Sequence, residues 1–147
     1  YSEEMLIERN NNELANKLGN LVSRVSGLAE KNGVEKCSNK LLKKLDIKKI
    51  GKLIDGFELD KALNEIFAFV DICNEYVQDK KPWESGDKKV LYELVDSIRV
   101  ISILLSVFIP DACEKIAKDF GFKISFSEID KGFKGKVKKG EILFKKI

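Results

Sequence analysis

One row of polar residues near the start of the chain has the right spacing to bind a ligand along a surface. It contains three asparagines and one arginine at intervals of four residues: Asn12, Asn16, Asn20 and Arg24. In a helix, residues four apart lie one above another on one face. Asparagine offers both a donor and an acceptor, and arginine offers a planar fork of donors. Such a row suits the edges of nucleic-acid bases, but it also suits an ordinary solvated helix face.

Trp83, the only tryptophan of the chain, is a second candidate for ligand contact. It directly follows Lys80, Lys81 and Pro82, and the proline ring restricts the backbone beside it. An aromatic ring held next to two lysines could stack an unpaired base while the lysines contact phosphates. The alternative is that Trp83 covers the core at the end of a helix.

The composition argues against several classes of catalytic and metal site. The chain has no histidine, which removes the commonest general base and every Ser–His or Cys–His pair. Cys37, Cys73 and Cys113 form no CxxC pair, so we expect no zinc site and reduced thiols, as in a cytoplasmic protein. There is no P-loop or GxGxxG motif. The longest apolar run, residues 100–109, is about half of the ~20 residues that a membrane span needs, and no signal peptide is visible.

The apolar pattern predicts a helix bundle that would position these polar residues. The length of 147 residues and the hydrophobic content of 44% suit one compact domain. Apolar residues recur at intervals of four and three, as in bundle helices, and residues 34–56 are rich in lysine, with Asp46 as a possible cap. The expected helices are 2–9, 12–31, pieces within 34–56, 59–78, 87–109 and 110–121. The helix over 87–109 is apolar almost all round, so we expect it at the centre.

The last part of the chain differs in character. Phe122, Ile124 and Phe126 alternate as in a short strand. Residues 131–147 hold seven lysines against Glu141 alone, a charge of +6, whereas the whole chain carries +3. We therefore predict an all-α antiparallel bundle over residues 1–121 and an irregular basic extension over 122–147. A basic extension suits contact with nucleic acid or with an acidic neighbouring domain.

Four segments occur in the order found in one enzyme family. They are "ERNNNELANKLGNLVSRV" (8–25), "NEYVQDKKPWE" (74–84), "FIPDACEKIAKDFG" (108–121) and "GEILF" (140–144). By these segments, nearly the whole chain resembles the C-terminal anticodon-binding domain of methionyl-tRNA synthetases, which are class I aminoacyl-tRNA synthetases. The resemblance implies a helix bundle that binds the CAU anticodon of methionine tRNA.

The resemblance also implies roles for single residues. Asn20 and Arg24 match family residues that contact anticodon bases, and Trp83 matches the tryptophan on which the first anticodon base stacks. Asn16, on the same face as Asn20, is a further candidate. Lys80 and Lys81 are candidates for phosphate contacts. No catalytic residue and no metal ligand is implied.

The HIGH and KMSKS motifs, which bind ATP in the catalytic domain of this family, are absent from the chain. We therefore expect the chain to be inactive alone and to bind no cofactor, with ATP used by the parent enzyme. The expected partners are methionine tRNA and the catalytic domain, against which residues 122–147 would pack; DNA and membranes are not expected. Two alternatives are the anticodon-binding domain of another class I synthetase and a helical protein-interaction module.

Overall fold

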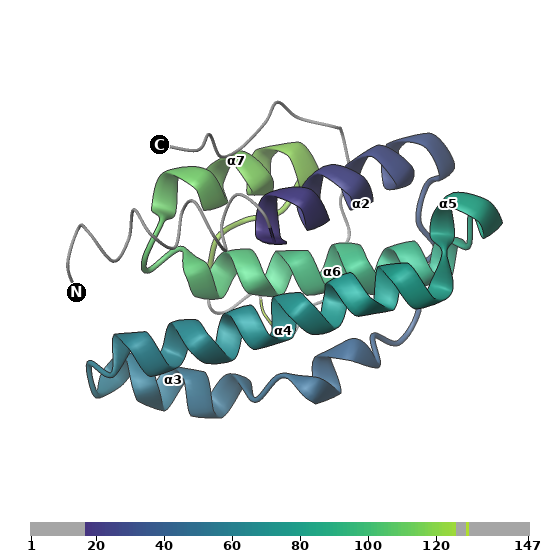
Figure 1. The fold of residues 1–147 in the computed structure, drawn as a ribbon. Coiled ribbons are helices and arrows are strands. Elements are labelled where there is room, and N and C mark those ends of the chain that lie inside the picture. The colour runs from purple at the N-terminus through teal and green to yellow at the C-terminus, as the bar shows by residue number, and fades with distance from the viewer. Residues whose placement is uncertain (1–16, 126–128, 130–147) are drawn as a thin grey trace.

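The computed structural model describes residues 17–125 and residue 129, which fold into helices without any strand (Figure 1). This confirms the predicted all-α class. The elements in chain order are α2 (Gly19–Asn32), the 3-10 helix η2 (Leu41–Lys44), α3 (Ile47–Asp55), α4 (Leu59–Lys80), α5 (Pro82–Ser85), α6 (Lys88–Leu105) and α7 (Pro110–Phe120). The helix predicted over 2–9, together with Asn12 and Asn16, lies outside the described residues.

Helix α6 lies at the centre of the bundle, as its apolar sequence predicts (Figure 1). It packs against α2, α4, α7 and η2, and from residue 90 to residue 105 only Glu93 is not buried. The helix ends at Leu105, before the predicted residue 109. The amides of Phe108 and Ile109 both donate to the carbonyl of Leu105 at 2.9 Å. Ile109 leaves the helical conformation (φ −134°, ψ 68°), because the ring of Pro110 disfavours that conformation in the residue before it.

Two of the predicted helix ends are fixed by local signals. The carboxylate of Asp46 accepts a hydrogen bond from the amide of Lys49 at 3.0 Å and so caps the start of α3. Gly121 takes a left-handed backbone (φ 71°) and ends α7, as glycine commonly does after a helix. Both predictions are confirmed.

The turn between α3 and α4 places an aromatic residue where glycine is usual. The amide of Glu58 donates to Leu53 at 2.8 Å and the amide of Phe57 donates to Ile54 at 3.1 Å, which is the Schellman pattern that closes a helix. The left-handed residue of that pattern is Phe57 (φ 60°) rather than the preceding Gly56. The side chain of Phe57 is 86% exposed, so little packing offsets the backbone strain.

The strand predicted over 122–126 is wrong for the part that the structure describes, because residues 122–125 have no regular secondary structure. The amide of Phe122 donates to Ala117 at 3.0 Å, and its ring meets that of Phe120 edge to face at 6.4 Å. Phe122 therefore closes α7, and Ile124 packs against the core instead of pairing in a sheet. Phe126 lies outside the described residues.

A buried polar network holds two distant segments to α6. Arg99 is 2% exposed and Asp96 is 3% exposed, and the Arg99 Nε lies 3.0 Å from the Asp96 Oδ1. The amide of Asn39, in the loop before η2, donates to the Asp96 Oδ2 at 2.9 Å. The Arg99 Nη2 donates to the carbonyl of Ile129 at 2.7 Å. Arg99 and Asp96 thereby fasten both that loop and residue 129 of the C-terminal extension to the central helix.

Candidate nucleic-acid interface

The packing of α2 turns part of the predicted polar row outward. Leu18, Leu21 and Val25 are fully buried, whereas Asn20 and Arg24 are exposed. The apolar spacing predicts this arrangement, and it is confirmed for the described half of the row. Both exposed residues line one groove.

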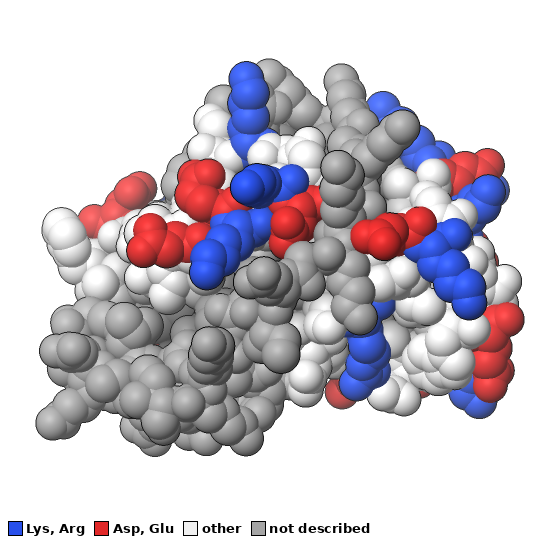
Figure 2. All heavy atoms as spheres, turned by 90° about the horizontal axis from the view of Figure 1, so that it is seen from above, with Lys and Arg blue, Asp and Glu red and all other residues white. Residues whose placement is uncertain are grey.

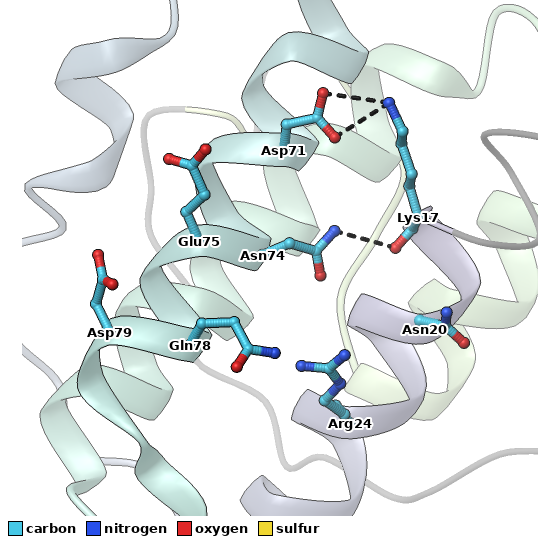
Figure 3. Close-up of a pocket in the computed structure, with 8 residues that line it drawn as sticks. All are labelled: Lys17, Asn20, Arg24, Asp71, Asn74, Glu75, Gln78 and Asp79. Carbon is cyan, nitrogen blue, oxygen red and sulfur yellow. Dashed lines mark hydrogen bonds and ion pairs between the residues drawn. The ribbon is translucent and has the colours of Figure 1, made fainter.

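The groove lies between α2 and α4 and has a volume of about 500 Å³ (Figure 3). Every residue that lines it is polar or charged. One wall is formed by Asn20 and Arg24 of α2 and by Lys17, two residues before α2 begins. The other wall is formed by Asp71, Asn74, Glu75, Gln78 and Asp79 of α4. The side chains of this lining offer hydrogen-bonding groups and charges to a ligand.

The two walls of the groove are tied together at one end. The Lys17 Nζ lies 3.2 Å from the carboxylate of Asp71, and the amide of Asn74 donates to the Lys17 carbonyl at 3.3 Å. Farther along, the guanidinium of Arg24 and the amide of Gln78 face one another across the groove (Figure 3). Neither side chain has a hydrogen bond or ion pair with another described residue, so both can bind a ligand.

The α4 wall of the groove is acidic. Asp71, Glu75 and Asp79 recur at intervals of four, which places them on one face of the helix. Together with Lys17 and Arg24 opposite, they give the lining three negative and two positive charges. A phosphate would be repelled by the α4 wall, whereas the uncharged edge of a base would not. The groove therefore suits bases better than backbone phosphates.

Sequence reasoning did not single out Asn74 and Gln78, the two amides of this wall. A signal was present, because the buried residues Val70, Cys73 and Val77 define the core face of α4. On a helical wheel, residues 74 and 78 lie beside that face, at the border between core and solvent.

Trp83 lies on α5, which directly follows α4, and it is not among the residues that line the groove. Helix α4 ends at Lys80 because Pro82 disfavours the helical conformation in the residue before it. Lys81 takes a left-handed backbone (φ 47°, ψ 57°). Pro82 is buried, but Trp83 is 46% exposed. Almost half of the Trp83 surface is therefore open to stacking, so the ring does not serve the core alone.

Lys80 and Lys81, the two predicted phosphate contacts, are both exposed. The Lys80 Nζ lies 5.8 Å from the centre of the Tyr76 ring, a cation–π contact. The hydroxyl of Tyr76 donates to the carboxylate of Glu93, and burial together with this carboxylate raises the pKa of Tyr76. These contacts hold Lys80 at the end of α4, after the groove residue Asp79 and before Trp83 in the sequence.

The described residues also bear on thiol reactivity, metal binding and membrane insertion. Burial raises the pKa of Cys73 and of Cys113 to about 12, so both thiols stay protonated at neutral pH. Within the described residues, no cluster of three His, Cys, Asp or Glu side chains could hold a metal ion. In the same part of the chain, no helix is long and apolar enough to span a membrane.

Comparisons with known proteins match this arrangement to one family. A family model described as the anticodon-binding domain of tRNA ligase matches residues 39–143. The methionine–tRNA ligases of Clostridium tetani and Caldanaerobacter subterraneus are 31% and 33% identical to the whole chain, which spans 27% of each. The methionine–tRNA ligase of Borrelia garinii is 35% identical over 97% of the chain, which spans 22% of that ligase.

Solved structures share the fold. The free-state methionyl-tRNA synthetase of Mycobacterium tuberculosis superimposes on the whole chain with a TM-score of 0.85 at 21% identity, over 35% of its own length. The same synthetase bound to methionyl-adenylate superimposes on 99% of the chain with a TM-score of 0.84 at 22% identity, over 34% of its length. The chain thus spans only part of every relative named. Because the family model matches most of its residues, the chain belongs to the family of anticodon-binding domains of tRNA ligases.

Proposed function

We propose that this chain recognises the CAU anticodon of methionine tRNA as the tRNA-binding part of a methionine–tRNA ligase. The carrying observation is the groove between α2 and α4, which is lined by polar and charged residues, together with the exposed Trp83 on α5, the helix that follows α4. The similarity to methionine–tRNA ligases favours methionine tRNA over the tRNA of another class I synthetase, and it counts against a purely protein-binding module. The rest of the ligase would bind ATP and catalyse aminoacylation.

An anticodon loop presents unpaired bases, whose edges are open to side chains. One base would stack on Trp83, a contact of about 1–3 kcal/mol that discriminates poorly among bases. Another base would enter the groove, where Arg24 and Gln78 offer hydrogen-bonding groups from facing walls. A wrong base would leave one of these groups without a partner, and such a loss rejects a ligand more strongly than a poor apolar fit does. Asn20, one turn before Arg24, and Asn16 would extend this recognition along α2.

Charge would keep the RNA backbone outside the groove. The carboxylates of Asp71, Glu75 and Asp79 repel phosphates from the α4 wall, while Lys80 and Lys81 attract them toward α5. The bases would therefore point inward and the phosphates outward.

The same proposal accounts for the C-terminal extension and the cellular location. Residues 122–147 would fasten the bundle to the catalytic domain, and the bond between Arg99 and Ile129 would fix the start of this connection on α6. The protein would act in the cytoplasm, where translation uses charged tRNA.

The proposal is tested first at Trp83. Replacing it with alanine should weaken binding of a CAU hairpin RNA at least tenfold, because the stacking contact is lost. Phe57→Ala is the matched control, since it removes another exposed aromatic ring at the other end of α4 (Figure 1). Equal affinities for the Trp83→Ala and wild-type proteins, with circular dichroism showing both folded, would rule out stacking.

The second test separates base recognition from phosphate contact at Arg24. We expect Arg24→Ala to reduce the preference for a CAU hairpin over a hairpin with an altered anticodon. If both RNAs lose affinity by the same factor, Arg24 contacts phosphate and does not read a base.

A further inference from the structure

A strongly basic segment lies outside the groove, and none of its residues lines it. Residues 36–52 contain seven lysines and a single acid, Asp46, a net charge of +6. We call these residues the lysine segment. All seven lysines are exposed: Lys36, Lys40, Lys43, Lys44, Lys48, Lys49 and Lys52.

The positive charge of the lysine segment is little compensated within the bundle. Lys49 forms an ion pair with Glu65 of α4 at 2.8 Å, and Asp46 is engaged as the cap of α3. The other six lysines form no ion pair with any carboxylate that the structure describes. Crowded like charges repel one another and attract a polyanion. A bound polyanion would therefore relieve the electrostatic repulsion among these lysines.

Three of the lysines surround one hollow. Lys43 and Lys44 at the end of η2 and Lys48 in the first turn of α3 line a cavity of about 770 Å³, together with Ile129. η2 and α3 therefore present three ammonium groups to one space, which is also lined by the carboxylate-bearing Asp46. Lysine suits such a site because its flexible stem brings a point charge to a phosphate without demanding a fixed orientation.

The lysine segment begins beside the end of the bundle that carries Trp83. The amide of Glu35 donates to the carbonyl of Lys88 at 3.1 Å, and the Cys37 Sγ lies 3.6 Å from the carbonyl of Lys89. Residues 88 and 89 start α6, just after α5. From there the segment runs along α4, with which α3 packs (Figure 1). Helix α4 has 22 residues, or about 33 Å at 1.5 Å each, and the lysine segment runs beside it.

Neighbouring surfaces do not offer the same charge. The exposed face of α4, between the groove and the lysine segment, carries Asp71, Glu75 and Asp79. The face on the side of α2 and α7 shows basic and acidic side chains intermixed (Figure 2). A polyanion that reaches the lysine segment is therefore guided past the α5 end and not across α4.

We propose that the lysine segment binds the sugar–phosphate backbone of the RNA whose loop is read at the groove, along the stem next to that loop. This inference rests on the proposed function and adds a second contact surface to it. Because the lysines follow one another along this segment, several of them would contact phosphates of one stem together. Contact with phosphates adds affinity without base preference.

The test compares two triple variants that remove the same charge. Lys43→Gln, Lys44→Gln and Lys48→Gln together empty the hollow of cations. The control variant carries Lys115→Gln, Lys118→Gln and Lys123→Gln. These lysines are exposed on α7 and just after it. The affinity of each protein for a CAU hairpin with a full stem is measured at several salt concentrations.

Each lost phosphate contact lowers the slope of log affinity against log salt by about 0.7–0.9. We expect the Lys43/Lys44/Lys48 variant to lose about 2 from this slope and to bind at least tenfold more weakly at low salt. The control variant should stay close to the wild type. For a hairpin cut to a short stem, the difference between the two variants should shrink.

Two results would overturn the inference. If both triple variants lose affinity equally, only net charge matters. If the Lys43/Lys44/Lys48 variant binds the hairpin like the wild type, the lysine segment serves another partner, such as an acidic protein surface. If that triple variant binds normally but Trp83→Ala weakens hairpin binding, base recognition is still supported. If the wild-type protein binds no hairpin at all, the proposed function itself is overturned.

Discussion

Replacing Arg99 with methionine tests whether the buried polar network stabilises the fold. The side chain is 2% exposed, its Nε pairs with Asp96 at 3.0 Å, and its Nη2 donates to the carbonyl of Ile129 at 2.7 Å. Methionine keeps much of the apolar stem but removes the guanidinium. Asp96 would then stay buried without its cationic partner, although the amide of Asn39 would still donate to it. The carbonyl of Ile129 would lose a charged donor.

Removing one partner of a buried ion pair costs about 3–5 kcal/mol, because a buried charge loses its compensation. This is a large share of the total stability of about 5–15 kcal/mol that a domain has. For a chain of this length, 1 kcal/mol shifts the melting temperature by roughly 3 °C, so we expect Arg99→Met to lower it by about 10–15 °C.

Urea unfolding followed by circular dichroism measures the loss. Arg24→Met is the matched control, because Arg24 is exposed on α2 and surface changes usually stay within about 0.5 kcal/mol. The double variant Asp96→Asn with Arg99→Met should be more stable than Arg99→Met alone, since it removes the uncompensated charge. The reasoning fails if Arg99→Met costs less than about 1 kcal/mol, or if the double variant shows simple additivity.

Two further stability predictions follow from single sites. Phe57→Gly should raise the urea midpoint, with a gain of up to about 1 kcal/mol, because glycine accepts the left-handed backbone (φ 60°) and the 86% exposed ring gives up little packing. Burial raises the pKa of Cys73 and Cys113 to about 12, so their contribution to stability is intact below the unfolded pKa near 9 and is lost progressively between about pH 9 and pH 12. The urea midpoint should therefore fall between pH 8 and pH 10.5. The underlying free energy of unfolding decreases by up to about 1.4 kcal/mol per pH unit for each thiol.

The sequence predicts those parts of the fold that depend on local signals. Asp46 caps α3 because a side-chain carboxylate can reach the amide three residues later, and Gly121 ends α7 because its left-handed backbone is easy for glycine. The central place of α6 follows from its composition alone. Each of these predictions needs only a few neighbouring residues.

Other features depend on contacts between distant residues, which a single sequence does not reveal. Arginine is a residue type that is usually exposed on a helix. Arg99 is nevertheless buried, because its guanidinium pairs with Asp96 and donates to the carbonyl of Ile129, 30 positions farther along the chain. Phe122 and Ile124 alternate like a strand, but no partner strand lies beside them in the described chain. In the groove, Arg24 was predicted from α2, whereas Gln78 faces it only because α4 packs alongside.

The distribution of charge sets the direction from which RNA would approach. A phosphate placed about 5 Å from one carboxylate of the α4 wall meets a repulsion of roughly 3 kcal/mol at an effective dielectric constant of about 20, more than an average hydrogen bond returns. Base edges carry no such penalty, so bases rather than phosphates would enter between Arg24 and Gln78 in the proposed complex. In the proposed complex the backbone would leave past Lys80 and Lys81 toward the lysine segment. Base recognition and backbone binding thus require opposite charges on adjacent surfaces, which is the arrangement that α4 and residues 36–52 provide.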